Sequence, residues 1–347
     1  MEQRLGNYHL TRLLARGGFA EVYLGLHVYL NNQAAIKVLL TQLSDHDKAS
    51  FLNEARTLVN LIHPNIVRVL EFGIEDTTPY LVMDYAPNGS LRQCYPKGER
   101  LPLSSVVPYV KQAASALQLA HDQRLIHRDI KPENMLMGRN NELLISDFGI
   151  AAFAHSTISE STQQIVGTAA YMAPEQVQGK PRPASDQYSL AIVAYEWLCG
   201  ERPFHGSLTE LATQQLFTDP PPLREQAPDV SPAVEQVIMT ALAKDPSQRY
   251  GSIQEFANAL EFASQSSLQP AMLQPNNPMF SQALVVKSNE SAEAVSPSSP
   301  TSEVVPPSSP ASKEQASVKG LSGIRGGTFF TTQGKRKVLN VTIGVLL

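Results

Sequence analysis

The stretch "HRDIKPEN" (127–134) is the most informative part of this 347-residue chain. It places Asp129, Lys131 and Asn134 within six positions, and a second acidic turn, "SDFG" (146–149), follows. Carboxylate and amide oxygens suit a hard cation such as Mg²⁺, which commonly keeps phosphate and water ligands as well. A carboxylate that does not bind the metal can accept a proton from a hydroxyl group. Any one acid alone is explained as well by a turn cap, but the set in this order favours a catalytic loop.

The composition is that of a soluble globular protein, with 42% hydrophobic and 17% charged residues. The formal net charge of −4 gives no indication of nucleic-acid binding. Two cysteines, Cys94 and Cys199, lie far apart in apolar surroundings, which predicts buried thiols in a reducing compartment. The first residues show no signal peptide. We therefore expect a cytoplasmic enzyme or binding protein.

A change of composition near residue 264 predicts the domain organisation. Residues 8–263 alternate apolar segments with turn signals and predict a folded domain. Residues 264–334 are rich in serine and proline and bury too little apolar surface to offset their ordering entropy, so a disordered linker is expected. Residues 335–347 begin with a basic cluster and then become apolar.

The folded region divides into a strand-rich part, about residues 8–86, and a larger helical part, about residues 87–263. Alternating or short apolar runs predict strands at "EVYLGLHV" (21–28), "AAIKVLL" (34–40) and "PYLVMDY" (79–85). This distribution predicts an α+β fold with two lobes.

Two apolar patterns in the second part predict its main helices. The segment "SSVVPYVKQAASALQLA" (104–120) has apolar residues on one face, and Ser104 and Ser105 are its candidate N-caps. The segment "YSLAIVAYEWLCG" (188–200) is apolar nearly all round, so we expect a buried central helix.

Lys37 lies in a strand that otherwise looks buried, where an unpaired charge is costly. In "FLNEARTLVNLI" (51–62), apolar residues from Phe51 to Ile62 recur at helical spacing, and Glu54 flanks this stripe. We therefore expect Glu54 to pair with Lys37. The alternative is a strand-edge lysine that reaches water.

A glycine loop is predicted at "LARGGFAEV" (14–22), where Gly17 and Gly18 lie between two strands. Backbone N–H groups in such a loop can approach phosphates closely. An ordinary hairpin explains this stretch equally well.

With these motifs in order, the chain resembles the protein kinases. The resemblance rests on "AAIK" with Lys37, on Glu54, on "HRDIKPEN", on "DFG" (147–149) and on "APE" (173–175), and it covers residues 8–263. The stretches "GGFAEVYLG" and "GTAAYMAPEQ" are similar to the bacterial serine/threonine kinases of eukaryotic type. The resemblance implies a small β-rich N-lobe, a larger α-helical C-lobe and a disordered tail. It also implies Mg²⁺-assisted transfer of the γ-phosphoryl group of ATP to Ser and Thr.

The resemblance assigns catalytic roles to four residues. Asp129 would be the catalytic base, and Lys131 would neutralise charge on the transferred phosphoryl group. Lys37, fixed by Glu54, would grip the α- and β-phosphates. The sequence Lys131-Pro132-Glu133 favours Ser or Thr over Tyr as the acceptor.

The resemblance also implies the ligands of ATP and Mg²⁺. Asn134 and Asp147 would hold Mg²⁺. The nucleotide pocket would be formed by Leu14, Gly17, Gly18, Val22, Ala35, Lys37, Met83, Asp84, Ala86 and Leu136. The first and third loop glycines of the family are replaced by Ala15 and Ala20, which puts the flexibility of the loop in doubt.

Regulation is expected through phosphorylation of "HSTISESTQQIV" (155–166). Thr162 matches the usual site, Ser161 is a second candidate, and Arg128 is a cation poised for the phosphate. Thr168 matches a threonine that hydrogen-bonds the catalytic loop in such kinases.

Three further positions have implied structural roles. Glu175 is expected to form a buried ion pair with Arg249 that anchors the substrate platform. Asp186 is also expected to have a structural role. The alternative for the pair is a surface contact, which stabilises little.

Two other functions compete with an active protein kinase. A pseudokinase scaffold that signals by contact would lack the base, a metal ligand or the strand lysine, but all of these are present. A small-molecule phosphotransferase would lack a peptide platform, and "GTAAYMAPEQ" argues for such a platform.

The tail suggests a membrane-spanning helix, because Lys335-Arg336-Lys337 precede the apolar "VLNVTIGVLL" (338–347). As a helix, this run reaches only about 15 Å, whereas a bilayer core is about 30 Å thick. Our hypothesis is a truncated version of a membrane-anchored kinase, and the alternative is a complete soluble kinase with an apolar terminus. Expected partners are ATP, protein substrates and a second copy for autophosphorylation, with no nucleic acid.

Overall fold

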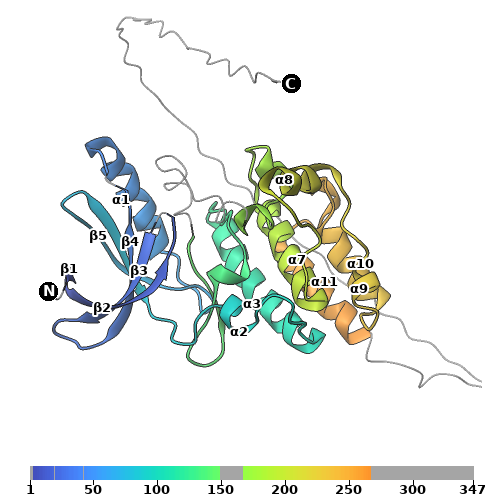
Figure 1. Cartoon of the computed structure of the whole chain (residues 1–347), viewed down its shortest axis with the longest axis horizontal. Coiled ribbons are helices and arrows are strands. Elements are labelled where there is room, and N and C mark those ends of the chain that lie inside the picture. The colour runs from blue at the N-terminus through green and yellow to red at the C-terminus, as the bar shows by residue number, and fades with distance from the viewer. Residues whose placement is uncertain (1–2, 19, 42, 149–166, 267–347) are drawn as a thin grey trace, which may run out of the picture. The chain divides into compact units, whose positions relative to one another are not determined.

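The computed structural model describes residues 3–18, 20–41, 43–148 and 167–266. These residues form a small lobe around a β-sheet and a larger helical lobe, which follow one another along the chain (Figure 1). The predicted two-lobed α+β fold is confirmed.

The small lobe is a six-stranded antiparallel sheet with the order β1-β2-β3-β4-β6-β5. Its strands are β1 (Arg4–Leu5), β2 (Tyr8–Arg16), β3 (Ala20–His27), β4 (Gln33–Leu39), β5 (Val69–Glu75) and β6 (Thr78–Asp84). The helix α1 (Asp45–Val59) lies between β4 and β5 in the chain. The three predicted strands correspond to β3, β4 and β6.

Both faces of the sheet carry buried side chains. Because successive residues of a strand point to opposite faces, Leu81 and Met83 of β6 join the main core, whereas Tyr80 and Val82 join a separate cluster. The main core continues through α1 into the helical lobe. In β4, Ala35 and Leu39 join the main core, whereas Ile36 and Val38 belong to the separate cluster. Lys37 alternates with Ile36 and Val38, so it lies on the face that packs against the main core.

The large lobe is mainly helical, with one two-stranded sheet, β7-β8. Its elements are α2 (Leu91–Cys94), α3 (Leu103–Asp122), the 3₁₀ helix η1 (Pro132–Asn134), β7 (Met135–Met137), β8 (Leu143–Ile145), α6 (Pro174–Val177), α7 (Pro183–Cys199), α8 (Leu208–Phe217), α9 (Leu223–Gln226), α10 (Pro232–Ala241), the 3₁₀ helix η2 (Pro246–Gln248) and α11 (Ile253–Ser266).

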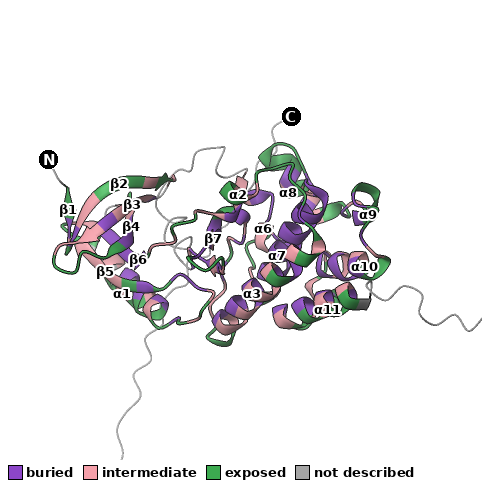
Figure 2. Ribbon diagram, turned by 90° about the horizontal axis from the view of Figure 1, so that it is seen from below, coloured by how far each residue is buried: buried purple, intermediate pink, exposed green. Residues whose placement is uncertain are grey.

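The helix α7 is the centre of this lobe. All its residues from Ser185 to Cys199 are buried, and it contacts α3, α10 and α11 (Figure 2). The predicted central helix is confirmed, but it begins at Pro183, before the apolar run. Proline suits that first turn because its missing N–H would have no partner there.

The helix α1 ends earlier than its apolar stripe predicts. Phe51, Ala55 and Leu58 are buried as expected. The helix stops at Val59 with Asn60 as the C-cap, so Ile62 lies beyond it and is 64% exposed. Including Ile62 in the helical stripe was wrong, because the stripe continues in the sequence after the backbone has left the helix.

The helix α3 buries its predicted apolar face, but its predicted caps are wrong. The N-cap is Pro102, with extended backbone, and Ser104 and Ser105 lie inside the first turn. An N-cap residue has non-helical, typically extended, backbone. Pro102 has it, whereas Ser104 and Ser105 are already part of the helix.

One of the two predicted buried thiols is exposed. Cys94 lies at the exposed end of α2, which contradicts the prediction, whereas Cys199 is buried. Burial raises the pKa of the Cys199 thiol to about 11. Cys199 is therefore a packed thiol that stays protonated near neutral pH.

The last described element shifts one boundary. The helix α11 ends at Ser266, so residues 264–266, expected to start the linker, are helical. Residues 267–347 lie outside the described part, and with them the predicted disorder and the basic and apolar tail. Among the described helices, none has both the length and the apolar character needed to cross a bilayer.

Candidate active site

A cavity of about 1030 Å³ is lined by residues of both lobes. All ten residues predicted for the nucleotide pocket, from Leu14 to Leu136, line it. Asp129, Lys131, Asn134, Asp147 and Thr168 line it as well. Its volume is that of a site for a ligand of nucleotide size. The structure thus brings motifs that are far apart in the sequence to one cavity.

The predicted glycine loop is the turn between β2 and β3. The N–H of Gly17 donates to the carbonyl of Ala20 at 2.8 Å, and Arg16 pairs with Glu21 at 2.7 Å across the turn. Ala20 is buried in the main core, and Ala15 pairs with Val22 in the strand register. The two alanines that replace glycines therefore lie in strands, Ala15 beside an irregularity of the β2–β3 register, while Gly17 and Gly18 line the cavity.

The backbone of the catalytic loop is held by one buried carboxylate. Asp186 of α7 accepts hydrogen bonds from the backbone N–H of His127 at 2.9 Å and of Arg128 at 2.8 Å. The ring of His121 lies 2.7 Å from the same carboxylate. Arg128 has a left-handed φ of 70°, which costs free energy for a residue with a side chain. The contacts of Asp186 stabilise this strained turn.

His127 joins the catalytic loop to the acidic turn at Asp147. Its Nδ1 accepts the backbone N–H of Asp129 at 3.2 Å, and its Nε2 lies 2.8 Å from the carbonyl oxygen of Ser146. The proton of a neutral ring therefore belongs on Nε2, which donates to Ser146. The ring also packs edge-on against Phe148, with centroids 4.6 Å apart.

The carboxylate of Asp129 is oriented by two neighbours. Lys131 Nζ and Asn134 Nδ2 each lie 2.8 Å from Oδ2. In the described part of the chain both contacts reach the same oxygen, so Oδ1 remains able to accept a hydroxyl proton. Lys131 also donates to Thr168 Oγ1 at 2.9 Å, which confirms the predicted contact between Thr168 and the catalytic loop.

Lys37 is buried as predicted, but its partner differs from the predicted one. Its ammonium lies 2.7 Å from Oδ1 of Asp147, and the ion pairs of the described residues include none with Glu54. Burial raises the pKa of the Glu54 carboxyl, and the guanidinium of Arg128 partly opposes this shift. The predicted Lys37–Glu54 pair is therefore absent from this conformation. The apolar packing of α1 fixes where Glu54 lies, and Asp147 supplies the anion that Lys37 requires.

The oxygen atoms of Asp147 and Asn134 fit a magnesium site. Burial alone would raise the pKa of Asp147, but Lys37 lowers it, and the net shift is downward, so the group is a carboxylate. The amide nitrogen of Asn134 is occupied by Asp129, which leaves its oxygen for a cation. The described residues contain no cluster of three or more His, Cys, Asp or Glu suited to a metal. Mg²⁺ held here would depend on phosphate and water oxygens for its other ligands.

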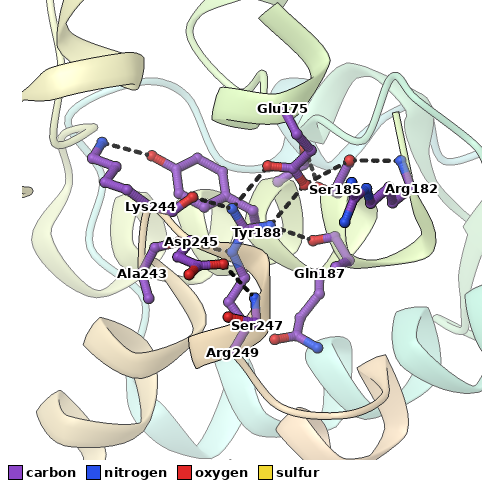
Figure 3. A network of polar contacts seen from close by, with 12 residues as sticks. Glu175, Arg182, Ser185, Gln187, Tyr188, Ala243, Lys244, Asp245, Ser247 and Arg249 are labelled. Atoms are coloured by element: carbon purple, nitrogen blue, oxygen red, sulfur yellow. Dashed lines mark hydrogen bonds and ion pairs between the residues drawn. The ribbon is translucent and has the colours of Figure 1, made fainter. Parts of the chain in front are cut away.

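The predicted ion pair between Glu175 and Arg249 is present and buried (Figure 3). It is bidentate, with Nη1 at 2.8 Å from Oε1 and Nη2 at 2.9 Å from Oε2. The hydroxyl of Ser185 also donates to Glu175, at 2.7 Å. The surface-contact alternative is excluded by this burial.

Every N–H donor of Arg249 has an acceptor. Besides Glu175, the guanidinium donates to the carbonyl oxygens of Ala243 and Ala184 at 2.8 Å and of Lys244 at 3.2 Å. Its central carbon also lies 4.8 Å from the centre of the Tyr188 ring. A fully hydrogen-bonded pair of this kind offsets the cost of burying two charges. It ties α6 to the segment before α11.

Lys244, beside this pair, predicts a pH dependence of stability. Its ammonium lies 4.4 Å from the centre of the Phe204 ring and 3.2 Å from the hydroxyl of Tyr188, and burial lowers its pKa from 10.5 to about 8. Between these two pH values the unfolded chain keeps a proton that the folded protein has lost. Stability rises with pH wherever the unfolded state binds more protons.

We therefore expect the free energy of unfolding of the wild type to rise relative to that of Lys244→Met as the pH increases from about 8 to about 10.5. Urea unfolding of both proteins at several pH values measures it. Lys48→Met, in α1, is the control for a lysine distant from this network. A difference that stays constant across the interval would contradict the assigned pKa.

The sequence did not indicate several residues near the catalytic loop. Arg92 of α2 lies 2.9 Å from Glu133 and 2.8 Å from Glu196, and Gln176 of α6 also lines the cavity. Glu133 belongs to the octapeptide, so its presence near the site could have been inferred. Arg92 carried no comparable signal, because its partners come from distant parts of the chain.

The predicted regulatory residues are only partly described. Arg128 is exposed and lines the cavity. Thr162 and Ser161 lie in the segment 149–166, outside the described residues.

The chain is similar to a large group of known proteins. A family model described as "Protein kinase domain" matches residues 8–261. The chain is 40% identical over 271 residues to "Serine/threonine-protein kinase Pkn1" of Myxococcus xanthus, covering 75% of this chain and 38% of that protein. It is 38% identical over 265 residues to "Serine/threonine-protein kinase PknA" of Mycobacterium tuberculosis, covering 74% and 61%. It is 32% identical over 296 residues to "Serine/threonine-protein kinase PrkC" of Bacillus subtilis, covering 83% and 46%. The matched region is less than two thirds of each relative.

Proposed function

Because this chain belongs to the protein kinase family, we propose that it transfers the γ-phosphoryl group of ATP to Ser and Thr hydroxyls of proteins. The observation that carries the proposal is the arrangement around Asp129. One oxygen of this carboxylate is held by Lys131 and Asn134, and the other is available for a hydroxyl. The names of the relatives support Ser and Thr as acceptors.

The proposed mechanism relies on position and charge, because phosphoryl transfer asks little covalent chemistry of the protein. Asp129 orients the acceptor hydroxyl and accepts its proton. Lys131 lies beside that carboxylate, where it can stabilise negative charge on the transferred group. Asn134 and Asp147 would hold Mg²⁺, which would supply positive charge against the phosphates. Lys37 holds phosphate oxygens from the sheet.

The peptide platform supports a protein rather than a small molecule as the acceptor. Gly167, Thr168 and Met172 line the same cavity as the catalytic loop, and Lys131 donates to Thr168. The buried pair of Glu175 and Arg249 fixes the helix that follows. No observation favours a pseudokinase. The residues that a pseudokinase would lack are present, and Asp129, Lys131 and Asn134 are in direct contact with one another.

The proposal is tested with the full chain, radiolabelled ATP and Mg²⁺. Label is expected on the protein itself and on a generic protein substrate, at Ser and Thr by phosphoamino-acid analysis. The variant Lys37→Met should lose most of the transfer because the phosphates lose their cation. Asp229→Asn, at an exposed position away from the cavity, is the control. If wild-type protein transfers no phosphate with fresh ATP and Mg²⁺, the proposed function is wrong.

We also propose that phosphorylation within residues 155–166 activates the protein. The exposed cation Arg128 supports this, because a phosphate can form charge-assisted hydrogen bonds with a guanidinium. Mass spectrometry after incubation with ATP is expected to find phosphate on Thr162, or on Ser161 if Thr162 is changed. Changing every Ser and Thr of the segment to Ala should lower activity, because the segment can then carry no phosphate for Arg128 to bind. Full activity of that variant would contradict the proposal.

Two proposals about partners rest on the sequence and on the family. Phosphorylation between two copies of the chain is expected to show a rate that rises with protein concentration. Membrane association through the basic and apolar residues 335–347 rests on their charge pattern, and binding of the full chain to anionic vesicles tests it.

A further inference from the structure

Arg92 joins three side chains that are far apart in the sequence. Its Nε lies 2.9 Å from Oε1 of Glu133. Its Nη2 lies 2.8 Å from Oε1 of Glu196 and 2.6 Å from the hydroxyl of Tyr171. That hydroxyl also donates to Oε2 of Glu196. One guanidinium therefore serves two carboxylates, the buried Glu196 and Glu133 at the cavity.

Glu133 is the carboxylate at the cavity. It follows Asp129 by four residues, lines the same cavity, and its side chain is 42% exposed. A free carboxylate so close to the catalytic base would attract a basic side chain of a bound protein substrate. The charge of Glu133 is instead met from within the protein by Arg92.

A substrate cation cannot easily replace Arg92. The side chain of Arg92 is only 15% exposed, and that of Glu196 is 4% exposed. If Arg92 turned away from this position, Glu196 would be left as a buried charge without a cation, which is strongly unfavourable. The interior contacts therefore hold the guanidinium against Glu133.

The other charges near the catalytic base do not restore an acidic surface. Asp129 is paired with Lys131 at 2.8 Å, and Arg128 is an exposed cation that lines the cavity. Gln176 of α6, which donates to the carbonyl oxygen of Arg128, lines the cavity without charge. Beside Asp129 and Glu133, a bound peptide would therefore meet carboxylates that are already paired, and the cation Arg128.

We infer that Arg92 is a specificity-determining residue, which neutralises Glu133 so that the site selects acceptors with neutral or acidic neighbours and not with basic ones. This inference rests on the proposed kinase function. Arg92 acts through Glu133 and is a positioning residue, because Glu133 lines the cavity and Arg92 is not among the described residues that do.

The test compares three sets of Ser-containing peptides, in which each position flanking the acceptor is in turn Arg, Ala or Glu. For wild-type protein, kcat/KM for Arg peptides is expected to be no higher than for Ala peptides. In Arg92→Met/Glu196→Gln, which removes the guanidinium without leaving a buried charge, kcat/KM for Arg peptides should rise about three- to tenfold over Ala peptides at one or more positions, mainly through KM. Adding Glu133→Gln should abolish that gain.

A conservative single change covers the case in which the double variant does not fold. In otherwise wild-type protein, Glu133→Gln should leave the Arg to Ala ratio within about twofold, because Glu133 is already neutralised. A wild-type preference for Arg peptides that disappears in Glu133→Gln would overturn the inference. So would a folded, active double variant with no gain. If the wild type is active, either of these two results refutes only the inference about Arg92 and leaves the proposed function intact. If the wild type transfers phosphate neither to any peptide nor to itself, both the inference and the proposed function are refuted.

Discussion

Replacing Asp129 by asparagine is expected to lower phosphate transfer at least about 100-fold, within the range of general acid–base contributions. The amide has nearly the same shape and can keep the contacts of Lys131 and Asn134, which both reach Oδ2 of the native carboxylate. It cannot accept a proton from the acceptor hydroxyl at neutral pH. The binding of ATP should change little, because the proposed role of Asp129 is to contact the acceptor hydroxyl through Oδ1 and not to contact the nucleotide.

Two measurements separate these effects. Radiolabel transfer gives the rate, and titration calorimetry with ATP and Mg²⁺ gives the nucleotide affinity. Asp229→Asn controls for an exposed carboxylate, since Asp229 pairs only with the partly exposed Arg100 in the described part of the chain. Autophosphorylation of Asp129→Asn at a rate comparable to wild type would refute the role of Asp129.

Arg249→Ala is expected to destabilise the protein by about 3–5 kcal/mol, the usual cost of removing one partner of a buried ion pair. The variant leaves the carboxylate of Glu175 buried with Ser185 as its remaining hydrogen-bond donor among side chains. Three carbonyl oxygens also lose the guanidinium, namely those of Ala184, Ala243 and Lys244. Thermal melting should show a decrease of roughly 10 °C.

The chain contains a matched exposed pair for comparison. Lys111 pairs with Glu261 at 2.6 Å, but both side chains are more than a third exposed, so Lys111→Ala should cost at most about 1 kcal/mol. Glu175→Gln/Arg249→Met should cost less than Arg249→Ala, because no unpaired charge is left. Equal melting temperatures for Arg249→Ala and Lys111→Ala would show that burial does not strengthen the Glu175–Arg249 contact.

The sequence predicted the residues that short motifs specify. The octapeptide, the acidic turn and the strand lysine appear in an order that implies the two lobes, and the structure places them around one cavity. Glu175 and Arg249 were predicted by the same resemblance, although they are 74 positions apart. These contacts were predictable because each residue belongs to a recognisable segment.

The contacts that escaped prediction depend on how whole elements pack. Lys37 and Glu54 lie on β4 and α1, and the apolar residues that seat α1 determine whether their charges meet. The contact of Arg92 with Glu196 joins positions 104 apart, and neither residue belongs to a distinctive motif. Local patterns also failed at element ends, as with Ile62, where a stripe of apolar residues outlasts the helix.

The pair formed by Lys37 and Asp147 has a consequence for how ligands enter the cavity. In this conformation each group satisfies the other, with 2.7 Å between ammonium and carboxylate. If an anion bound alone, Lys37 would pair with it and the carboxylate of Asp147 would lose its cation. If a cation bound alone, Asp147 would pair with it and the ammonium of Lys37 would lose its anion. Arrival of both lets the two groups exchange partners with no charge left over. If Lys37 binds phosphate and Asp147 binds Mg²⁺, as proposed, the occupancies of the two sites are thermodynamically coupled, and by reciprocity each ligand strengthens the binding of the other.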